Sequence, residues 1–277
     1  MSKGIVASFP RLIKQIFEDD VFGLAAQLAY FFLLSLFPLL LFLFTLISYL
    51  PITSTHLLGF VQDFAPGDTI NLIETNLNEI MDNRNGKLLS LGIIGTIWSA
   101  SNGIDAIVKA FNKAYNVKET RSFLVARGMS VVLTLAMIFV FIIVLLLPVF
   151  GREIGIFVFS KLGFSQQFLV IWNTLRWVIS TIVLMIVFLC LYWIAPNKKI
   201  KCQSVLPGSI FATIGWSLAS LGFSYYVGSI GNYSATYGSI GAIIVLMIWF
   251  YITGVIIILG GEINGFSSRL KDDESCK

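Results

Sequence analysis

The sequence predicts an all-α membrane protein, a bundle of six transmembrane helices, and two observations carry that prediction. Of the 277 residues, 57% are hydrophobic and 12% are charged, whereas a soluble domain carries roughly 25% charged residues. Six apolar segments are each close to the ~20 residues that a helix needs to cross a bilayer. We place them at residues 24–50, 88–110, 129–150, 169–195, 204–228 and 238–262. The whole chain, residues 1–277, is therefore expected to form a single integral membrane domain.

The distribution of basic residues predicts how these helices are oriented. With the N-terminus inside the cell, fourteen of the 19 Lys and Arg residues fall in inner segments and four in outer loops. Because Lys and Arg concentrate in cytoplasmic loops, this bias places both termini in the cytoplasm. The same bias accounts for the net charge of +4, so no nucleic-acid partner is expected. None of the three cysteines falls in an outer loop, and no structural disulfide is predicted.

Three segments outside the spans have patterns of their own. Residues 1–20 combine helically spaced apolar side chains with Lys and Arg, which is typical of an amphipathic helix in the cytoplasmic interface. The outer loop, residues 51–87, contains a second amphipathic pattern that starts at Pro66–Gly67–Asp68. Since aspartate is a preferred residue for capping a helix start, we expect a short helix there. Residues 263–277 are predicted to be a cytoplasmic tail.

A polar stripe interrupts the second predicted span, at residues 88–110. Ser99, Asn102, Asp105, Lys109 and, just beyond the span, Asn112 follow at steps of three, three, four and three, so they share one helical face. A carboxylate at the bilayer centre costs about 2.5–3.5 kcal/mol on insertion scales, and such a stripe is expected to face protein or water. We interpret it as the lining of a vestibule open to the cytoplasm. The alternative is a local i,i+4 ion pair whose side chains reach the membrane surface.

Other predicted spans contribute further candidates for a polar pathway. Gln27 and Tyr30 share one face near the inner end of the first span, and Glu262 ends the last span on the same side. Arg176 lies in the outer part of the fourth span, where it either gates a pathway or reaches lipid phosphates. Together with the polar stripe, these four residues form the candidate pathway.

Two features are predicted to shape helix packing. Pro38 lies in the middle of the first span, where it removes a backbone donor and is expected to kink the helix. A seam of small residues runs along the fifth span and consists of Gly208, Ala212, Gly215, Ala219 and Gly222. Small side chains let two helices approach closely in lipid, so this seam is expected to pack inside the bundle. Homo-oligomerisation through the seam is the alternative.

The sequence shows no pattern typical of an enzyme. It has no G-x-S-x-G elbow, P-loop or dinucleotide-binding glycine motif, the motifs that signal nucleophilic or nucleotide chemistry. His56 is the single histidine, and no general acid and base come together. We therefore expect no enzymatic activity, no cofactor and no metal site.

Several motifs occur in a fixed order along the chain. They are Ala25–Ala26–Gln27–Leu28–Ala29–Tyr30, Ser35–Leu36–Phe37–Pro38, Ala110–Phe111–Asn112–Lys113–Ala114–Tyr115, Leu206–Pro207–Gly208, Tyr237–Gly238–Ser239–Ile240–Gly241–Ala242 and Gly260–Gly261–Glu262–Ile263–Asn264. Over nearly the whole chain they resemble the YihY/virulence factor BrkB family of bacterial inner-membrane proteins. The resemblance implies six helices in the bacterial plasma membrane, and a role linked to serum resistance, export of envelope lipid or lipopolysaccharide, or ion and osmotic tolerance. The family's former label, ribonuclease BN, has no support in these residues.

The polar stripe and this resemblance together predict a function in transport. The leading hypothesis is a transporter or flippase-like protein for a lipid or other amphipathic solute, linked to envelope homeostasis, with membrane lipids as partners. One alternative is an ion- or proton-coupled exchanger that uses Asp105 or Glu262 as its titrating carboxylate. Another is a membrane scaffold that does not transport and binds partners through the outer-loop helix or the small-residue seam.

Overall fold

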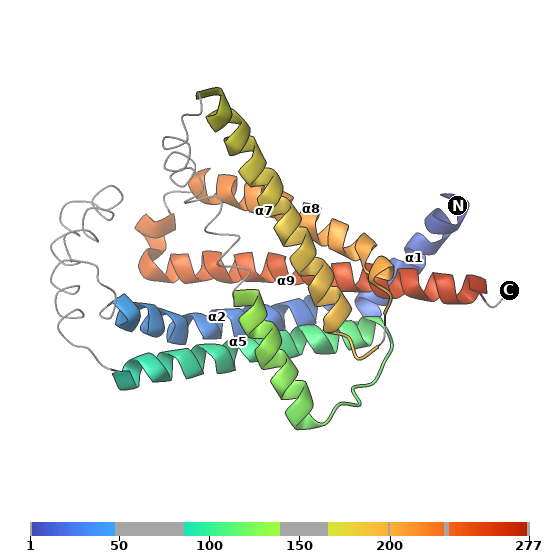
Figure 1. Cartoon of the computed structure of the whole chain (residues 1–277), viewed down its shortest axis with the longest axis horizontal. Helices are drawn as coiled ribbons and strands as arrows, with labels where there is room; N and C mark the ends of the chain where they lie inside the picture. Colours follow the sequence, from blue (N-terminus) through green and yellow to red (C-terminus); the bar gives the residue numbers. More distant parts are fainter. Residues whose placement is uncertain (1, 48–85, 139–165, 199, 230–232, 276–277) are drawn as a thin grey trace. The chain divides into compact units, whose positions relative to one another are not determined.

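The computed structural model describes residues 2–47, 86–138, 166–198, 200–229 and 233–275, and all regular structure within these ranges is helical. Figure 1 shows the long helices, which are α2 (Val21–Ile47), α5 (Gly86–Ala114), α7 (Gln166–Ile194), α8 (Leu206–Ser229) and α9 (Tyr233–Ser275). The shorter elements are α1 (Ser2–Glu18), a helix over Phe123–Ile138 and the 3-10 turn η1 (Cys202–Ser204). The chain is therefore all-α over its described part, as predicted.

Five of these helices are long and apolar enough to cross a membrane. The qualifying stretches are Val21–Phe42, Gly86–Ala114, Trp177–Ile194, Leu206–Val227 and Ile243–Arg269. Their exposed side chains include many large apolar ones, such as Phe37, Ile94, Ile182, Leu218 and Leu221. Exposed apolar surface of this extent matches lipid tails, which are as apolar as leucine. The prediction of a helical membrane protein is confirmed.

Several predicted boundaries differ from the structure, and α9 begins at Tyr233 instead of the predicted residue 238. The third span was predicted to begin at residue 129, but its helix begins at Phe123, and the predicted part beyond residue 138 lies outside the described residues. The last helix was predicted to end at residue 262, yet α9 continues to Ser275. It continues because no proline interrupts it and because Asn264 and Gly265 are still buried. The helix predicted in the outer loop lies outside the described residues.

The chain divides into two compact units, residues 31–100 and residues 1–30 with 101–277. In the smaller unit, α2 continues as a helix through Pro38, and a Cβ on Gly95 would lie 3.1 Å from the Cβ of that proline. A Cβ on Gly92 would lie 2.8 Å from the backbone nitrogen of Phe42. Glycines on α5 therefore make room for the proline ring and the backbone of α2.

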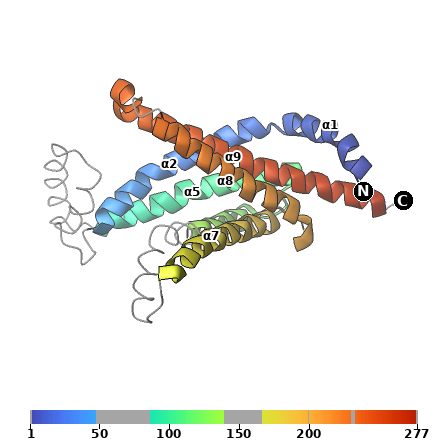
Figure 2. The same cartoon turned by 90° about the horizontal axis from the view of Figure 1, so that it is seen from above.

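In the larger unit, α8 packs against both α7 and α9, and α1 packs against α9; Figure 2 shows α1 beside the C-terminal part of α9. Its core contains the rings of Phe111 on α5 and Tyr192 on α7, with centroids 5.0 Å apart. The Tyr192 hydroxyl donates a hydrogen bond of 2.8 Å to the carbonyl oxygen of Ile257 on α9. Three helices are thus joined at one end of the unit.

Candidate functional site

Helices α8 and α9 touch backbone to backbone where Gly208 faces Gly260. A Cβ on Gly208 would overlap the carbonyl oxygen of Gly260 and the side-chain amide of Asn264. The N–H of Gly208 donates a hydrogen bond of 2.7 Å to the Asn264 side-chain oxygen. The first N–H groups of a helix have no partner within the helix, so Asn264 caps the start of α8 from the neighbouring helix. This contact explains why a glycine and an asparagine occur at these two positions.

Three glycines on α9 allow close contacts on two sides of the helix. A Cβ on Gly260 would overlap the hydroxyl of Tyr192, and a Cβ on Gly261 would lie 2.6 Å from the Phe111 ring. One turn further on, a Cβ on Gly265 would overlap the carbonyl oxygen of Ala114 at the end of α5. Helices α5, α7 and α8 therefore all meet α9 around residues 260–265, and Glu262 lies in the middle of this stretch.

Glu262 is a fully buried carboxyl group, with 0% of the residue exposed. Its Oε2 accepts a hydrogen bond from the side-chain amide of Gln15 on α1, whereas its Oε1 has no hydrogen-bond partner among the described residues. Arg269 donates a hydrogen bond of 3.1 Å to the carbonyl oxygen of Ala114, which lies 3.5 Å from the same Gln15 amide. We call Gln15, Ala114, Glu262 and Arg269 the Glu262 cluster. Burying a carboxylate is costly unless it is paired and hydrogen-bonded, so a half-satisfied one marks a candidate functional group.

Members of the polar stripe on α5 have protein partners. Asn102 accepts a hydrogen bond of 2.7 Å from the guanidinium of Arg127. Asp105 and Lys109 form the expected i,i+4 ion pair at 2.8 Å, with 34% and 67% of their side chains exposed. Ser99 is half-buried. Asn102 thus binds the helix that follows α5, and the charge of Asp105 is compensated at the surface.

The other predicted residues lie in different surroundings. Gln27 and Tyr30 on α2 are exposed, unlike Glu262, and the side chain of Arg176 on α7 lies outside the described part of the chain. Of the seam glycines, Gly215 has Ile256 on α9 at 3.4 Å from a Cβ position, and Gly222 has no atom within 4 Å. Among the predicted residues, the structure therefore places Gly208 on α8 against the stretch of α9, residues 260–265, that contains Glu262.

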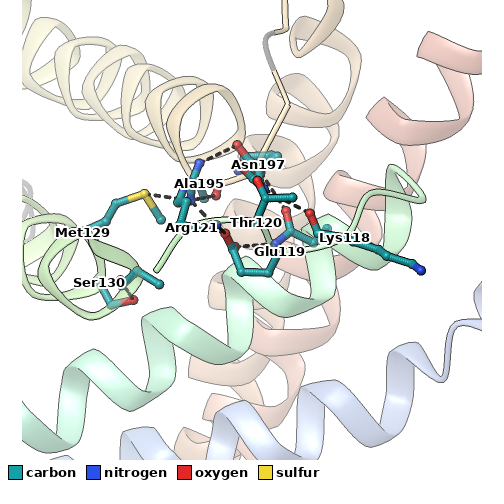
Figure 3. A network of polar contacts seen from close by, with 11 residues as sticks. Lys118, Glu119, Thr120, Arg121, Met129, Ser130, Ala195 and Asn197 are labelled. Carbon is teal, nitrogen blue, oxygen red and sulfur yellow. Dashed lines mark hydrogen bonds and ion pairs between the residues drawn. The ribbon is translucent and has the colours of Figure 1, made fainter. Parts of the chain in front are cut away.

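Two loops are joined by a network that Figure 3 shows in close-up. Helix α5 ends at Ala114. Two residues further on, Asn116 has a φ of 52°, a left-handed conformation that asparagine tolerates. The Asn112 side chain then bridges the loops, because it donates to Glu119 at 2.8 Å and accepts from the N–H of Asn197 at 2.7 Å. The Asn197 amide in turn donates to the Lys118 carbonyl oxygen at 3.0 Å. We call this arrangement, together with Arg121, the loop contact.

Arg121 closes the loop contact from the other side. Its guanidinium donates to the carbonyl oxygens of Ala195 at 3.3 Å and Pro196 at 3.0 Å, the two residues that follow the end of α7 at Ile194. Its backbone N–H donates to Glu119 at 3.0 Å, and the two side chains lie 4.0 Å apart. Arg121 therefore ties its own loop to the segment that follows α7, and these hydrogen bonds fix the position of its guanidinium.

Replacing Asn112 by alanine is expected to lower the free energy of unfolding by about 1–3 kcal/mol. The change leaves the N–H of Asn197 and one carboxylate oxygen of Glu119 without their partner. Thermal unfolding in detergent measures the effect, with Gln203→Ala, an exposed position in η1, as the control. Equal unfolding temperatures for the two variants would show that the loop contact adds nothing to stability.

Sequence reasoning missed several of these partners. Asn112 was visible as a continuation of the polar stripe, and Asn264 belongs to the motif that ends in Glu262, so both had a signal. In the sequence, Arg121 and Arg127 were used only in the count of Lys and Arg that predicts membrane orientation, and their side-chain partners were not predicted. Nothing in the pattern of residues 1–20 distinguishes Gln15 from other polar positions, because its role depends on how α1 packs against α9.

Several long apolar helices pack together and bury the carboxyl group of Glu262 where they meet. This arrangement is that of a polytopic helical membrane protein. Among the residues that the structure describes, no group of three or more His, Cys, Asp or Glu side chains is placed to hold a metal ion. The chain belongs to the family described as Virulence factor BrkB, which matches residues 12–275.

Relatives support the same assignment. The chain is 54% identical to a Bacillus subtilis (strain 168) protein named "Putative ribonuclease-like protein YfkH", over 89% of this chain and 90% of that one. It is 30% identical to a "UPF0761 membrane protein" of Vibrio campbellii, over 94% of this chain and 82% of the relative. A UPF0761 membrane protein of Aliivibrio salmonicida is 28% identical, over 91% and 80%. No solved structure matches the chain.

Proposed function

We propose that this protein is a transporter that moves a lipid or other amphipathic solute across the bacterial plasma membrane. The observation that carries the proposal is Glu262, a carboxyl group with 0% exposure within a helix able to span a membrane. Ionisable groups inside spanning helices are costly, and they commonly mark substrate and ion pathways. The polar stripe, with Ser99, Asn102, Asp105 and Lys109, and the outer Arg176 line the solute path in this proposal.

The proposed topology has six transmembrane helices and both termini in the cytoplasm. The helix that begins at Phe123 then continues as the third span, and α1 lies in the cytoplasmic interface with Phe17, which is 67% exposed, in the lipid. The orientation rests on the asymmetry of Lys and Arg between the two sides. In this topology the Glu262 cluster and the loop contact both lie at the cytoplasmic end of the bundle. Nothing in the proposal requires enzymatic activity.

Proton- or ion-coupled exchange is the second candidate, and the buried Oε1 of Glu262 favours it. This oxygen has no hydrogen-bond partner among the described residues, so it can take up a proton or an ion. Asp105 is the weaker choice for this role, because Lys109 already compensates its charge at 2.8 Å. Both candidate functions use the carboxyl group of Glu262. They differ in what is transported, which is a lipid or other amphipathic solute in the first and a proton or ion in the second.

Purified protein in liposomes distinguishes the candidates. A lipid transporter is expected to move fluorescent phospholipid between leaflets, measured by chemical quenching of the outer leaflet. An exchanger is expected to give proton or cation flux that depends on pH and salt but not on the labelled lipid. If both assays match protein-free liposomes, the transport proposal fails and a scaffold that binds partners is favoured.

A further inference from the structure

The two loops of the loop contact concentrate positive charge at the end of α7. Residues 113–121 and 198–201 contain six Lys and Arg residues and one acidic residue, Glu119. The carboxylate of Glu119 accepts hydrogen bonds from Asn112 and from the backbone of Arg121, and it lies 4.0 Å from the Arg121 guanidinium. Its single negative charge offsets only one of the six positive charges. A surface of this composition has a positive potential that attracts anions.

A shallow recess opens within this basic surface. It is lined by Arg121, Trp193, Ile194, Pro196, Asn197 and Lys198. Figure 3 shows Arg121 and Asn197 in the loop contact, near Ala195, which follows the end of α7. Because Arg121 is held by the carbonyl oxygens of Ala195 and Pro196, its guanidinium is fixed in place at the wall of the recess. A fixed guanidinium binds an anion with little loss of side-chain entropy.

Lys198 is the second cation of the recess, and its position is also constrained. Its ammonium group lies 5.9 Å from the centroid of the Tyr115 ring, within the range of a cation–π contact. Burial raises the pKa of the Tyr115 hydroxyl, so this phenol stays neutral and adds no negative charge near the recess. Two cations from different loops therefore line one opening.

The opposite wall of the recess is apolar and belongs to a membrane-spanning helix. Trp193 and Ile194 are 47% and 43% exposed on the last turn of the stretch Trp177–Ile194. The indole N–H of Trp193 donates to the carbonyl oxygen of Ile200 at 2.9 Å, which holds the ring at this boundary. Tryptophan is typical of the level at which lipid headgroups begin. The recess thus lies at the boundary between the hydrocarbon core of the membrane and the charged headgroup region.

We propose that this recess binds the headgroup phosphate of an anionic phospholipid from the cytoplasmic leaflet. The phosphate lies between Arg121 and Lys198, and the first part of an acyl chain lies along Trp193 and Ile194. Basic pockets on the cytoplasmic side of membrane proteins bind anionic headgroups by this combination of charge and apolar wall. The proposal uses the membrane orientation proposed above, but it does not depend on transport.

Lipid titrations followed by native mass spectrometry test the proposal on the full-length protein, delipidated in a neutral detergent. The ligands are phosphatidylglycerol, phosphatidylcholine and inorganic phosphate. The wild type is expected to bind phosphatidylglycerol more tightly than phosphatidylcholine. Lys198→Gln is expected to weaken phosphatidylglycerol binding about fivefold, since one basic residue near a lipid surface contributes about that factor. Lys198→Arg keeps the charge and is expected to keep the affinity.

Lys14→Gln is the matched control, because Lys14 is an exposed lysine on α1 that pairs with Glu18 at 3.5 Å. It is expected to bind phosphatidylglycerol as the wild type does. Equal affinity of the wild type for the two lipids, or equal affinities of Lys198→Gln and the control, would overturn the proposal. Inorganic phosphate that binds as tightly as phosphatidylglycerol would overturn the assignment to a lipid. If Lys198→Gln loses its preference for phosphatidylglycerol but transports as the wild type does, the transport proposal is unaffected. If a variant loses flux but keeps this lipid preference, the proposed lipid site is unaffected.

Discussion

Replacing Gly208 by alanine is expected to destabilise the protein by about 2–4 kcal/mol, through overpacking and a strained hydrogen bond. The new methyl group would overlap the carbonyl oxygen of Gly260 and the amide of Asn264. A backbone oxygen cannot move aside as a flexible side chain can, so α8 must shift away from α9. That shift also strains the 2.7 Å hydrogen bond from Gly208 to Asn264. The unfolding temperature in detergent and the yield of monodisperse protein measure the loss.

Gly222→Ala on the same helix is the control for this prediction. A Cβ on Gly222 meets no atom within 4 Å, and alanine is a better helix former than glycine by about 1 kcal/mol. This variant is therefore expected to be as stable as the wild type or slightly more stable. If Gly208→Ala were as stable as Gly222→Ala, α8 and α9 would not pack backbone to backbone at Gly208.

Replacing Glu262 by glutamine is expected to reduce transport to the level of protein-free liposomes while the protein stays folded. Glutamine has nearly the same shape, and its carbonyl oxygen still accepts the hydrogen bond that Gln15 donates to Oε2. What the change removes is the ability to exchange a proton or bind a cation at a buried position. Any residual flux is also expected to lose its dependence on pH. Flux in liposomes and unfolding temperature in detergent are measured on the same preparations.

Asp105→Asn provides the comparison for this prediction, since it also converts a carboxylate to an amide. Asp105 is 34% exposed and paired with Lys109, so its loss is expected to reduce flux less than the loss of Glu262. If Asp105→Asn lost flux and Glu262→Gln did not, the carboxyl group needed for transport would be that of Asp105 in the polar stripe. Wild-type flux in Glu262→Gln would show that the buried carboxyl group is not part of the pathway.

The sequence predicted the class of fold because a bilayer imposes its thickness on every spanning helix. Runs of apolar residues near 20 in length are visible without any knowledge of packing, and the described helices α2, α5, α7 and α8 begin within three residues of their predicted starts. Pro207 lies in the first turn of α8, where proline is tolerated because its missing backbone donor is not needed there. The far end of α9 was missed, since it depends on burial against neighbouring helices.

The candidate site was only partly visible in the sequence. Polarity within an apolar run singled out Asp105 and Glu262 alike, because each is an acidic residue near the end of a predicted span. Periodicity gives the face of a residue on its own helix and says nothing of what lies opposite. The structure separates the two carboxyl groups: Asp105 has its partner one turn away on the same helix, and Glu262 has its partner on α1.

The sequence by itself determined that this is a helical membrane protein and which of its residues are unusual for a spanning helix. Those properties follow from local composition, because the lipid acts on each helix separately. Only the tertiary structure decided that Glu262 is fully buried and that Gly208 meets Gly260. It also decided that Arg121 and Lys198 line one recess. These facts depend on contacts between residues far apart in the chain, and no pattern along one helix contains them.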